Sequence, residues 1–316
     1  MAVLVTGARG YIGSLLVAAL ARAGQKVVAL DVRSPGSDLP AGVRAVTADI
    51  GGPEAAQVIR DTRPDAVVHL AAIVTPPPDM TRADLHRVDV VGTRNVLDAC
   101  VAAGVGRFVV TSSGAAYGYY ADNPASISED QPLRGNPEFA YSDHKRQVEE
   151  MLADYRRTHP SLAQFVFRTC TILGAATRNQ ITALFERPRL LSIRGAASPF
   201  SFVWDGDVVA CLAHALSSDR PGVYNLAGDG SMTVQDIARR LGKSCLEVPA
   251  WAVAGALAVL KPLGLTPYGP EQVDFLRYRP VLANARLKRE FGFVPTHSSR
   301  DAFEAWASAQ RARAAA

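Results

Sequence analysis

Short apolar runs rich in β-branched residues alternate with longer amphipathic stretches through the first half of the chain. The runs have the length of buried strands, and the stretches between them have the length and periodicity of helices. Strands that alternate with helices predict an α/β fold with a doubly wound parallel sheet and right-handed crossovers. The runs expected to form these strands are residues 2–5, 26–30, 43–47, 66–70, 107–111 and 164–168.

A glycine-rich turn, TGARGYIG at residues 6–13, lies between the first predicted strand and a predicted helix over 12–23. Gly7 permits a tight turn, Gly10 lets the backbone approach a pyrophosphate, and Gly13 lets the helix pack close to the strand. The N-terminus of that helix then faces the phosphates. The pattern predicts a dinucleotide site of the Rossmann type.

The second predicted strand is followed by Asp31, about 20 residues beyond the glycines, where a carboxylate can bond the adenosine ribose hydroxyls. An acid at this place repels a 2′-phosphate, which favours NAD over NADP. Arg33 is close enough in sequence to accept that phosphate, so NADP stays open as the less favoured cofactor.

Tyr141 and Lys145 stand four residues apart in YSDHK, residues 141–145. On a helix this spacing puts a phenol and an ammonium group on one face, where the cation makes the phenolate easier to form. A phenol so placed can act as an acid or base near neutral pH. The pair therefore points to proton transfer next to a bound dinucleotide.

The strand and helix rhythm weakens beyond residue 168, where loop-like and proline-broken segments begin. We therefore expect an NAD-binding Rossmann domain over 1–168, with returns to the main sheet at about 200–227. Residues 169–199 and 228–316 would then form most of a smaller substrate-binding lobe. Ligands of such sheets bind at the carboxyl ends of the strands, where the motifs above gather.

Composition and charge exclude several classes of protein. With 48% hydrophobic and 20% charged residues, the chain resembles an ordinary globular protein. The formal charge of +4 is spread without a basic block, so nucleic acid is not an expected partner. The cysteines lack metal-ligand or redox spacing, which indicates a reducing, cytoplasmic location and no metal site. They are Cys100, Cys170, Cys211 and Cys245.

The chain begins with a strand rather than a secretory signal pattern, and no segment reaches the ~20 apolar residues that span a bilayer. The most apolar stretch is 249–260, which we expect to be a core or pocket helix, with peripheral membrane contact as the alternative. Its apolar stripe favours a place in the core over contact with a substrate. The stripe consists of Trp251, Val253, Leu257 and Leu260.

Several motifs, in the same order along the chain, resemble those of the extended short-chain dehydrogenase/reductase family, which includes NAD-dependent sugar epimerases and dehydratases. The resemblance covers nearly the whole chain. It implies a Rossmann-type fold, an enzyme, and dimerisation through helices that include the one with Tyr141. The motifs are TGARGYIG, HLAA at 69–72, SSGAAYG at 112–118, YSDHK, and VYNLAGDG at 223–230.

The resemblance also implies roles for single residues. Counting back four positions from Tyr117 places the catalytic hydroxyl at Ser113 rather than Ser112. Tyr141 would move a proton at the substrate oxygen, which Ser113 would hold. Lys145 would bond the nicotinamide ribose and favour the phenolate. Besides the glycines, Asp31 and Arg33, the implied cofactor contacts are Arg9, Tyr11, Ile12, Asp49 and Ile50 at the adenine, and Leu70, Ala71 and Ala72.

The chain departs from the sugar-nucleotide members of the family at places that contact substrate phosphate. Thr171 stands where they carry an asparagine, and Phe200 and Ser201 stand where an arginine is common. Asp89 replaces a helix asparagine, so the hydrogen bonds around it must differ. The missing contacts favour a smaller or more hydrophobic alcohol or ketone. Possible anion anchors remain at Arg178, Arg187, Arg189, Arg194, Arg277 and Arg279.

Three functions fit these observations. The first is an NAD-dependent oxidoreductase that interconverts a secondary alcohol and a ketone with net formation of NADH or NAD. The second is a sugar epimerase or dehydratase in which the cofactor is regenerated in place. The third is a regulator that binds NAD without turnover, which the Tyr141 and Lys145 pair disfavours.

Overall fold

The computed structural model describes residues 1–34, 39–77, 79–266 and 269–315. Seven parallel strands form one sheet in the order β10-β6-β5-β4-β1-β2-β3. This confirms the α/β fold with a parallel sheet, since each predicted strand is present within two residues of its expected bounds. The strands are β1 (Ala2–Thr6), β2 (Lys26–Asp31), β3 (Val43–Thr47), β4 (Ala66–His69), β5 (Arg107–Ser113), β6 (Ala163–Thr169) and β10 (Gly222–Leu226).

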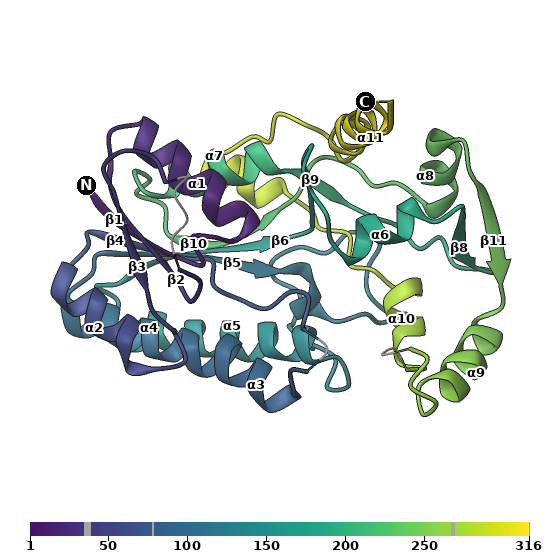
Figure 1. Ribbon diagram of the computed structural model, residues 1–316, viewed down its shortest axis with the longest axis horizontal. Coiled ribbons are helices and arrows are strands. Elements are labelled where there is room, and N and C mark those ends of the chain that lie inside the picture. Colours follow the sequence, from purple (N-terminus) through teal and green to yellow (C-terminus); the bar gives the residue numbers. More distant parts are fainter. Residues whose placement is uncertain (35–38, 78, 267–268, 316) are drawn as a thin grey trace.

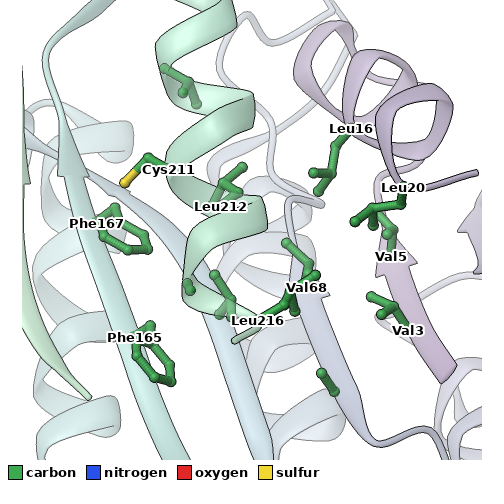
Figure 2. Close-up of a cluster of buried hydrophobic side chains, with 14 of the residues drawn as sticks. Val3, Val5, Leu16, Leu20, Val68, Phe165, Phe167, Cys211, Leu212 and Leu216 are labelled. Atoms are coloured by element: carbon green, nitrogen blue, oxygen red, sulfur yellow. The ribbon is translucent and has the colours of Figure 1, made fainter. Parts of the chain in front are cut away.

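Helices cover both faces of this sheet (Figure 1). On one face lie α1 (Tyr11–Arg22) and α7 (Asp205–Ala215), and on the other lie α2 (Pro53–Thr62), α4 (Gly92–Ala103) and α5 (Ala140–Thr158). Figure 2 shows how Leu16 and Leu20 of α1 meet Leu212 of α7 above the strands. A second apolar cluster fills the space under the opposite face. Burial of these side chains on both sides makes the sheet a rigid platform for its loops.

The predicted helical stretch over 81–103 is continuous but not uniformly α-helical. It consists of α3 (Arg82–His86), a π-helical turn η1 (Arg87–Val91) and α4. Thr81 begins it with a capping box, because its side chain accepts from Asp84 N while the Asp84 carboxylate accepts from Thr81 N. A π-helical turn inside a helix often marks a functional site, and this one presents Asp89 to the loop after β4.

Beyond β6 the chain builds two small parallel pairs of strands. β7 (Thr171–Leu173) pairs with β9 (Phe202–Trp204), and β8 (Arg189–Ile193) pairs with β11 (Ser244–Val248). The 223–227 segment returns to the main sheet as predicted, whereas β9 does not join it and only α7 comes back to pack against α1. The other elements are η2 (Gly114–Tyr117), α6 (Gln180–Glu186), α8 (Val234–Leu241), α9 (Ala250–Leu260), α10 (Gln272–Arg277), η3 (Leu287–Phe291) and α11 (Ser299–Ala315).

The apolar stretch at 249–260 forms α9, at the end of the molecule away from the main sheet (Figure 1). None of its residues is buried, and Trp251 is 78% exposed. Of the predicted core or pocket helix, the core alternative is therefore wrong, because the hydrophobic pattern of a segment does not reveal how much other structure covers it. The pocket alternative is confirmed, since Val253 and Leu257 line a cavity. Among the described helices, none is long and apolar enough to cross a membrane.

Candidate active site

A cavity of about 560 Å³ lies at the carboxyl ends of the central strands. Its wall includes Gly7 after β1, Leu70 after β4, Ser113 at the end of β5 and Thr169 at the end of β6. Lys145 of α5 completes that side of the wall. Parallel α/β sheets bind ligands at this edge, where strand order reverses between β1 and β4.

The sequence-predicted residues divide into two groups around this cavity. Ten of them line it: Gly7, Gly10, Tyr11, Ile12, Gly13, Leu70, Ala72, Ser113, Tyr141 and Lys145. The others lie outside its lining, beside the ends of β1 to β4: Arg9, Asp31, Arg33, Asp49, Ile50 and Ala71.

The glycine-rich turn lets three segments of backbone approach one another. Gly7 has φ +65°, and a Cβ there would stand 2.6 Å from Ala71 N. A Cβ on Gly13 would stand 2.1 Å from Gly7 O. At Gly10 the nearest described atom, Gly7 O, would lie 3.1 Å from a Cβ, and no side chain caps the helix that starts there. The open space and free N–H groups of α1 fit a pyrophosphate.

Asp31 presents a buried carboxylate at the end of β2. It accepts hydrogen bonds from Arg9 N at 2.9 Å and Arg33 N at 3.0 Å, and Arg33 Nε lies 3.1 Å away. Burial alone would raise the pKa of the Asp31 carboxyl, but the Arg33 side chain and these N–H groups together hold it below its ordinary value. The site therefore holds a fixed negative charge in the position expected for a ribose ligand.

Asp49 and Ile50 follow β3 and differ in what they offer. Asp49 accepts from Gly51 N at 2.8 Å and pairs with Arg87 Nη1 at 2.9 Å. The Ile50 side chain is buried in the core, and Gly92 makes room for it, because a Cβ on Gly92 would stand 2.8 Å from Ile50. Contact between Ile50 and a cofactor would therefore involve its backbone or the edge of its side chain.

Tyr141 and Lys145 lie one turn apart at the start of α5. The Lys145 Nζ donates to Thr111 O at 3.1 Å and lies 5.8 Å from the centroid of the Tyr141 ring. The carbonyl at the end of β5 thus fixes the ammonium group beside the phenol. Both side chains line the cavity, so the predicted face of the helix points toward bound ligand.

The two serines at the end of β5 have different partners. Ser112 is buried and donates to Glu149 Oε1 at 2.5 Å. Ser113 Oγ accepts from Ala115 N at 3.1 Å, which caps η2 and leaves the hydroxyl proton available. The structure therefore favours Ser113 over Ser112 as the hydroxyl that can meet a substrate.

Sequence reasoning missed the buried ion pair beneath this end of β5. Arg168 donates to both carboxylate oxygens of Glu149, at 2.7 to 3.0 Å, and its Nη1 donates to the Tyr117 hydroxyl at 2.7 Å. Tyr117 in turn donates to Asn225 Oδ1 at 2.9 Å, and burial raises its pKa to about 12. Tyr117 thus packs beneath the site and does not line the cavity. Complementary charges on β6 and α5 are the signal that could have revealed this pair.

Asp89, which replaces the helix asparagine of the family, has hydrogen-bond partners that suit a carboxylate. Asp89 Oδ1 accepts from Ile73 N at 2.9 Å, and Oδ2 lies 3.3 Å from His144 Nδ1 on α5. His69 is buried nearby, with Thr6 and Thr93 as its ring partners and a pKa lowered to about 3 by burial. These residues connect the loop after β4 to the helix of Tyr141 and do not line the cavity.

A series of aromatic rings that starts at Tyr141 forms part of the cavity wall. Tyr141, Phe139 and Phe275 follow one another with ring centroids 6.2 and 5.7 Å apart. Arg279 continues the series, with its guanidinium carbon 5.2 Å from the Phe275 ring and 3.9 Å from the Phe200 ring. In the sequence Arg279 is only one of several candidate anion anchors, because its place depends on how α10 folds back.

Residues 3–227 match the model of the NAD dependent epimerase/dehydratase family. The chain belongs to this family. Its members are enzymes that depend on NAD, so the predictions of an enzyme and of NAD as cofactor are confirmed.

Two curated proteins show how far the similarity in sequence extends. An uncharacterised protein of Mycobacterium tuberculosis is 27% identical over 308 residues, which cover 96% of this chain and 82% of that protein. A UDP-glucose 4-epimerase of Azospirillum brasilense is 38% identical over 178 residues, or 55% of this chain and 49% of that enzyme.

Two solved structures share the fold of this family member. One is the UDP-glucose 4-epimerase of Thermotoga maritima with UDP-glucose, with a TM-score of 0.78 and 21% identity over 99% of this chain and 100% of that chain. The other is the UDP-glucose 4-epimerase of Thermus thermophilus with NAD, with a TM-score of 0.74 and 24% identity over 98% of this chain and 99% of that chain.

Proposed function

We propose that the protein is an oxidoreductase that transfers hydride between NAD and the carbon of a secondary alcohol or ketone, and that it releases the changed cofactor after each turnover. The observation that carries the proposal is the shared cavity, which Ser113, Tyr141 and Lys145 line together with the glycine-rich turn. An alcohol and its ketone differ by a hydride and a proton, so the site needs one group for each.

NAD would supply the acceptor or donor of hydride when bound along the turn, and the residues of the chain would hold it there. The α1 N-terminus would bind the pyrophosphate, and Asp31 would accept from the adenosine ribose hydroxyls. Thr111 takes one of the three N–H donors that the Lys145 ammonium group carries. The remaining donors suit a ribose hydroxyl.

Tyr141 would remove the proton from the substrate hydroxyl during oxidation and return it during reduction. The ammonium group of Lys145 beside the phenol would stabilise the phenolate that forms. Ser113 would donate a hydrogen bond to the substrate oxygen and fix its distance from Tyr141. Each role uses a group whose position the protein sets before substrate binds.

Replacing Ser113 with alanine should lower turnover by about 10²- to 10³-fold, the usual effect of losing a donor to a reacting oxygen. Ser112→Ala is the matched control, since its hydroxyl serves Glu149. We expect Ser112→Ala to keep turnover within a few-fold and to lower the thermal midpoint instead. Steady-state kinetics and thermal melts of both variants make the comparison, and the reverse pattern would assign the role to Ser112.

Replacing Asp31 with alanine should weaken NAD binding about tenfold to a hundredfold, because a charge-assisted hydrogen bond is lost. NADP binding should change less or improve, since the repelling carboxylate is gone. Calorimetric titration of both dinucleotides measures the ratio, with Arg33→Ala as the control expected to weaken NADP only. An unchanged ratio in Asp31→Ala would show that Asp31 does not select the cofactor.

A second candidate is an epimerase or dehydratase that regenerates NAD in place. The 38% identity with a UDP-glucose 4-epimerase over half of the chain favours it. Thr171, Phe200 and Ser201 favour the first candidate, because these three side chains line the cavity without the amide or the positive charge that nucleotide-sugar members carry at the same places. Net NADH production separates the two.

The proposal also includes the organisation of the chain. We infer an NAD-binding domain over 1–168 with returns at about 200–227, and a substrate-binding lobe from 169–199 and 228–316.

We also propose a homodimer through α5 and a cytoplasmic location. The four cysteines, which are all free thiols, support the cytoplasmic location. Analytical ultracentrifugation tests the dimer.

A further inference from the structure

A second cavity of about 330 Å³ opens beside the first, between α6, α9 and α10. Its volume lies near the lower end of the range for small-molecule sites, about 300–1,000 Å³. Apolar side chains make most of its wall, including Leu184 of α6, Val253 and Leu257 of α9, and Leu276 of α10. The cavity therefore suits a hydrocarbon group.

The two cavities share a wall, and the shared residues lie at the far end of the aromatic series that starts at Tyr141. Phe200, Phe275 and Arg279 line both cavities, as do Gln180 and Ile181. The two cavities therefore adjoin beside Phe275, and a ligand held at Tyr141 that extends past this ring would enter the second cavity.

Arg279 provides a positive charge at the junction. It donates to Leu276 O at 3.1 Å, and its Nε is buried without a hydrogen-bond partner. In the described part of the chain, no carboxylate forms an ion pair with it. The Arg279 side chain is half-buried, and burial lowers its pKa to about 10. An anionic group of a ligand would supply the missing charge and hydrogen bonds.

Two other arginines line the second cavity but, unlike Arg279, have exposed side chains. Arg187 and Arg189 line its rim and are exposed to solvent. Water can hydrate an exposed guanidinium, so neither needs a ligand anion. The arginine that lacks a negatively charged partner is therefore Arg279, at the junction of the two cavities, rather than an arginine at the rim.

We propose that the substrate is an amphipathic anion, whose carboxylate or phosphate binds Arg279 and whose hydrocarbon group fills the second cavity while its hydroxyl or keto carbon reaches Tyr141. This inference rests on the proposed function, because it names the substrate class of the same site. It differs from a nucleotide sugar in that the larger part of the substrate beyond the anion is apolar.

Calorimetric titration of the NAD-loaded protein with hexanoate, octanoate and decanoate tests the hydrocarbon site. We expect affinity to rise about fourfold for each added methylene, as for burial of that group. Leu257→Trp, which fills the cavity, should flatten the rise, whereas Val259→Trp on the exposed side of the same helix should preserve it. Equal affinities for the three acids, or a rise lost only in Val259→Trp, would overturn the assignment.

Comparison of decanoate with decanol tests the anion site. Arg279→Gln should reduce the preference for decanoate by tenfold or more, and Arg187→Gln should leave it unchanged. The opposite result would place the anion at the rim and contradict the proposal. Tyr141→Phe should bind decanoate as the wild type does, because the two cavities and Arg279 are unchanged in it. A wild-type protein that keeps the chain-length dependence but oxidises no alcohol would overturn the proposed function alone. An active oxidoreductase without that dependence would overturn this inference alone.

Discussion

Replacing Tyr141 with phenylalanine should lower turnover by about 10²- to 10⁴-fold, the range in which a positioned acid or base contributes. The change removes one oxygen atom from a ring that lines the cavity beside Lys145. NAD affinity should stay within a few-fold, because the glycine-rich turn, Asp31 and the Lys145 ammonium group remain. Kinetics with an alcohol substrate and calorimetry with NAD measure the two effects separately.

Tyr155→Phe is the matched control for this substitution. Tyr155 lies on the same helix and donates its hydroxyl hydrogen bond to Asp98, away from the cavity. The Tyr155→Phe variant also loses one hydroxyl oxygen, but outside the cavity. Its turnover should therefore stay within about twofold, while its free energy of unfolding falls by roughly 1 kcal/mol. Equal turnover in Tyr141→Phe and Tyr155→Phe would remove Tyr141 from the reaction.

Replacing Arg168 with methionine should destabilise the fold by about 3–5 kcal/mol, because it leaves the buried Glu149 carboxylate without its positively charged partner. Burial alone would lower the pKa of Arg168, but the charge and hydrogen bonds of Glu149 raise it above the ordinary value. Denaturant unfolding followed by circular dichroism measures the loss.

The exposed pair of Arg157 and Asp154 on the same helix as Glu149 gives the control. Its nitrogen and oxygen lie 2.7 Å apart, yet the two side chains are 75% and 59% exposed. Arg157→Met should therefore change the free energy of unfolding by less than about 1 kcal/mol. A similar loss in both variants would mean that burial does not govern the strength of the Arg168 pair.

The sequence was sufficient to predict the main sheet and the residues around its carboxyl edge. Each strand of the sheet is a short apolar run, and parallel order leaves few topologies to choose from. The turn at Gly7 and the four-residue spacing of Tyr141 and Lys145 are local features, so they carry over directly into the structure. The cavity then brings these local features together, as strand ends of a parallel sheet must.

The rest depends on contacts between distant segments. The stripe on α9 fits a core or a pocket helix, and nothing in its own sequence states that Val253 and Leu257 would line the second cavity while Trp251 stays exposed. The sequence pattern places residues 202–204 in the main sheet, yet their pairing with β7 is a choice between two edges that hydrophobicity does not decide. Such choices are settled by packing.

The side-chain network under the site shows the same limit at the level of single residues. Adjacent serines at the end of β5 look alike in sequence, and only the position of Glu149 on α5 distinguishes Ser112 from Ser113. Asp89 is similar, since its new partners Ile73 and His144 come from a loop and another helix. Hydrogen-bond partners so far apart in sequence leave no local pattern.

The most direct test follows NADH absorbance while the purified protein is incubated with NAD and a panel of secondary alcohols, with products identified afterwards. The panel should include hydroxy acids with long hydrocarbon groups, free sugars and sugar nucleotides. The account predicts that NADH accumulates in equal amount with a ketone product, and that Tyr141→Phe forms neither. Conversion of a substrate without accumulated NADH would contradict the account and identify an epimerase or dehydratase.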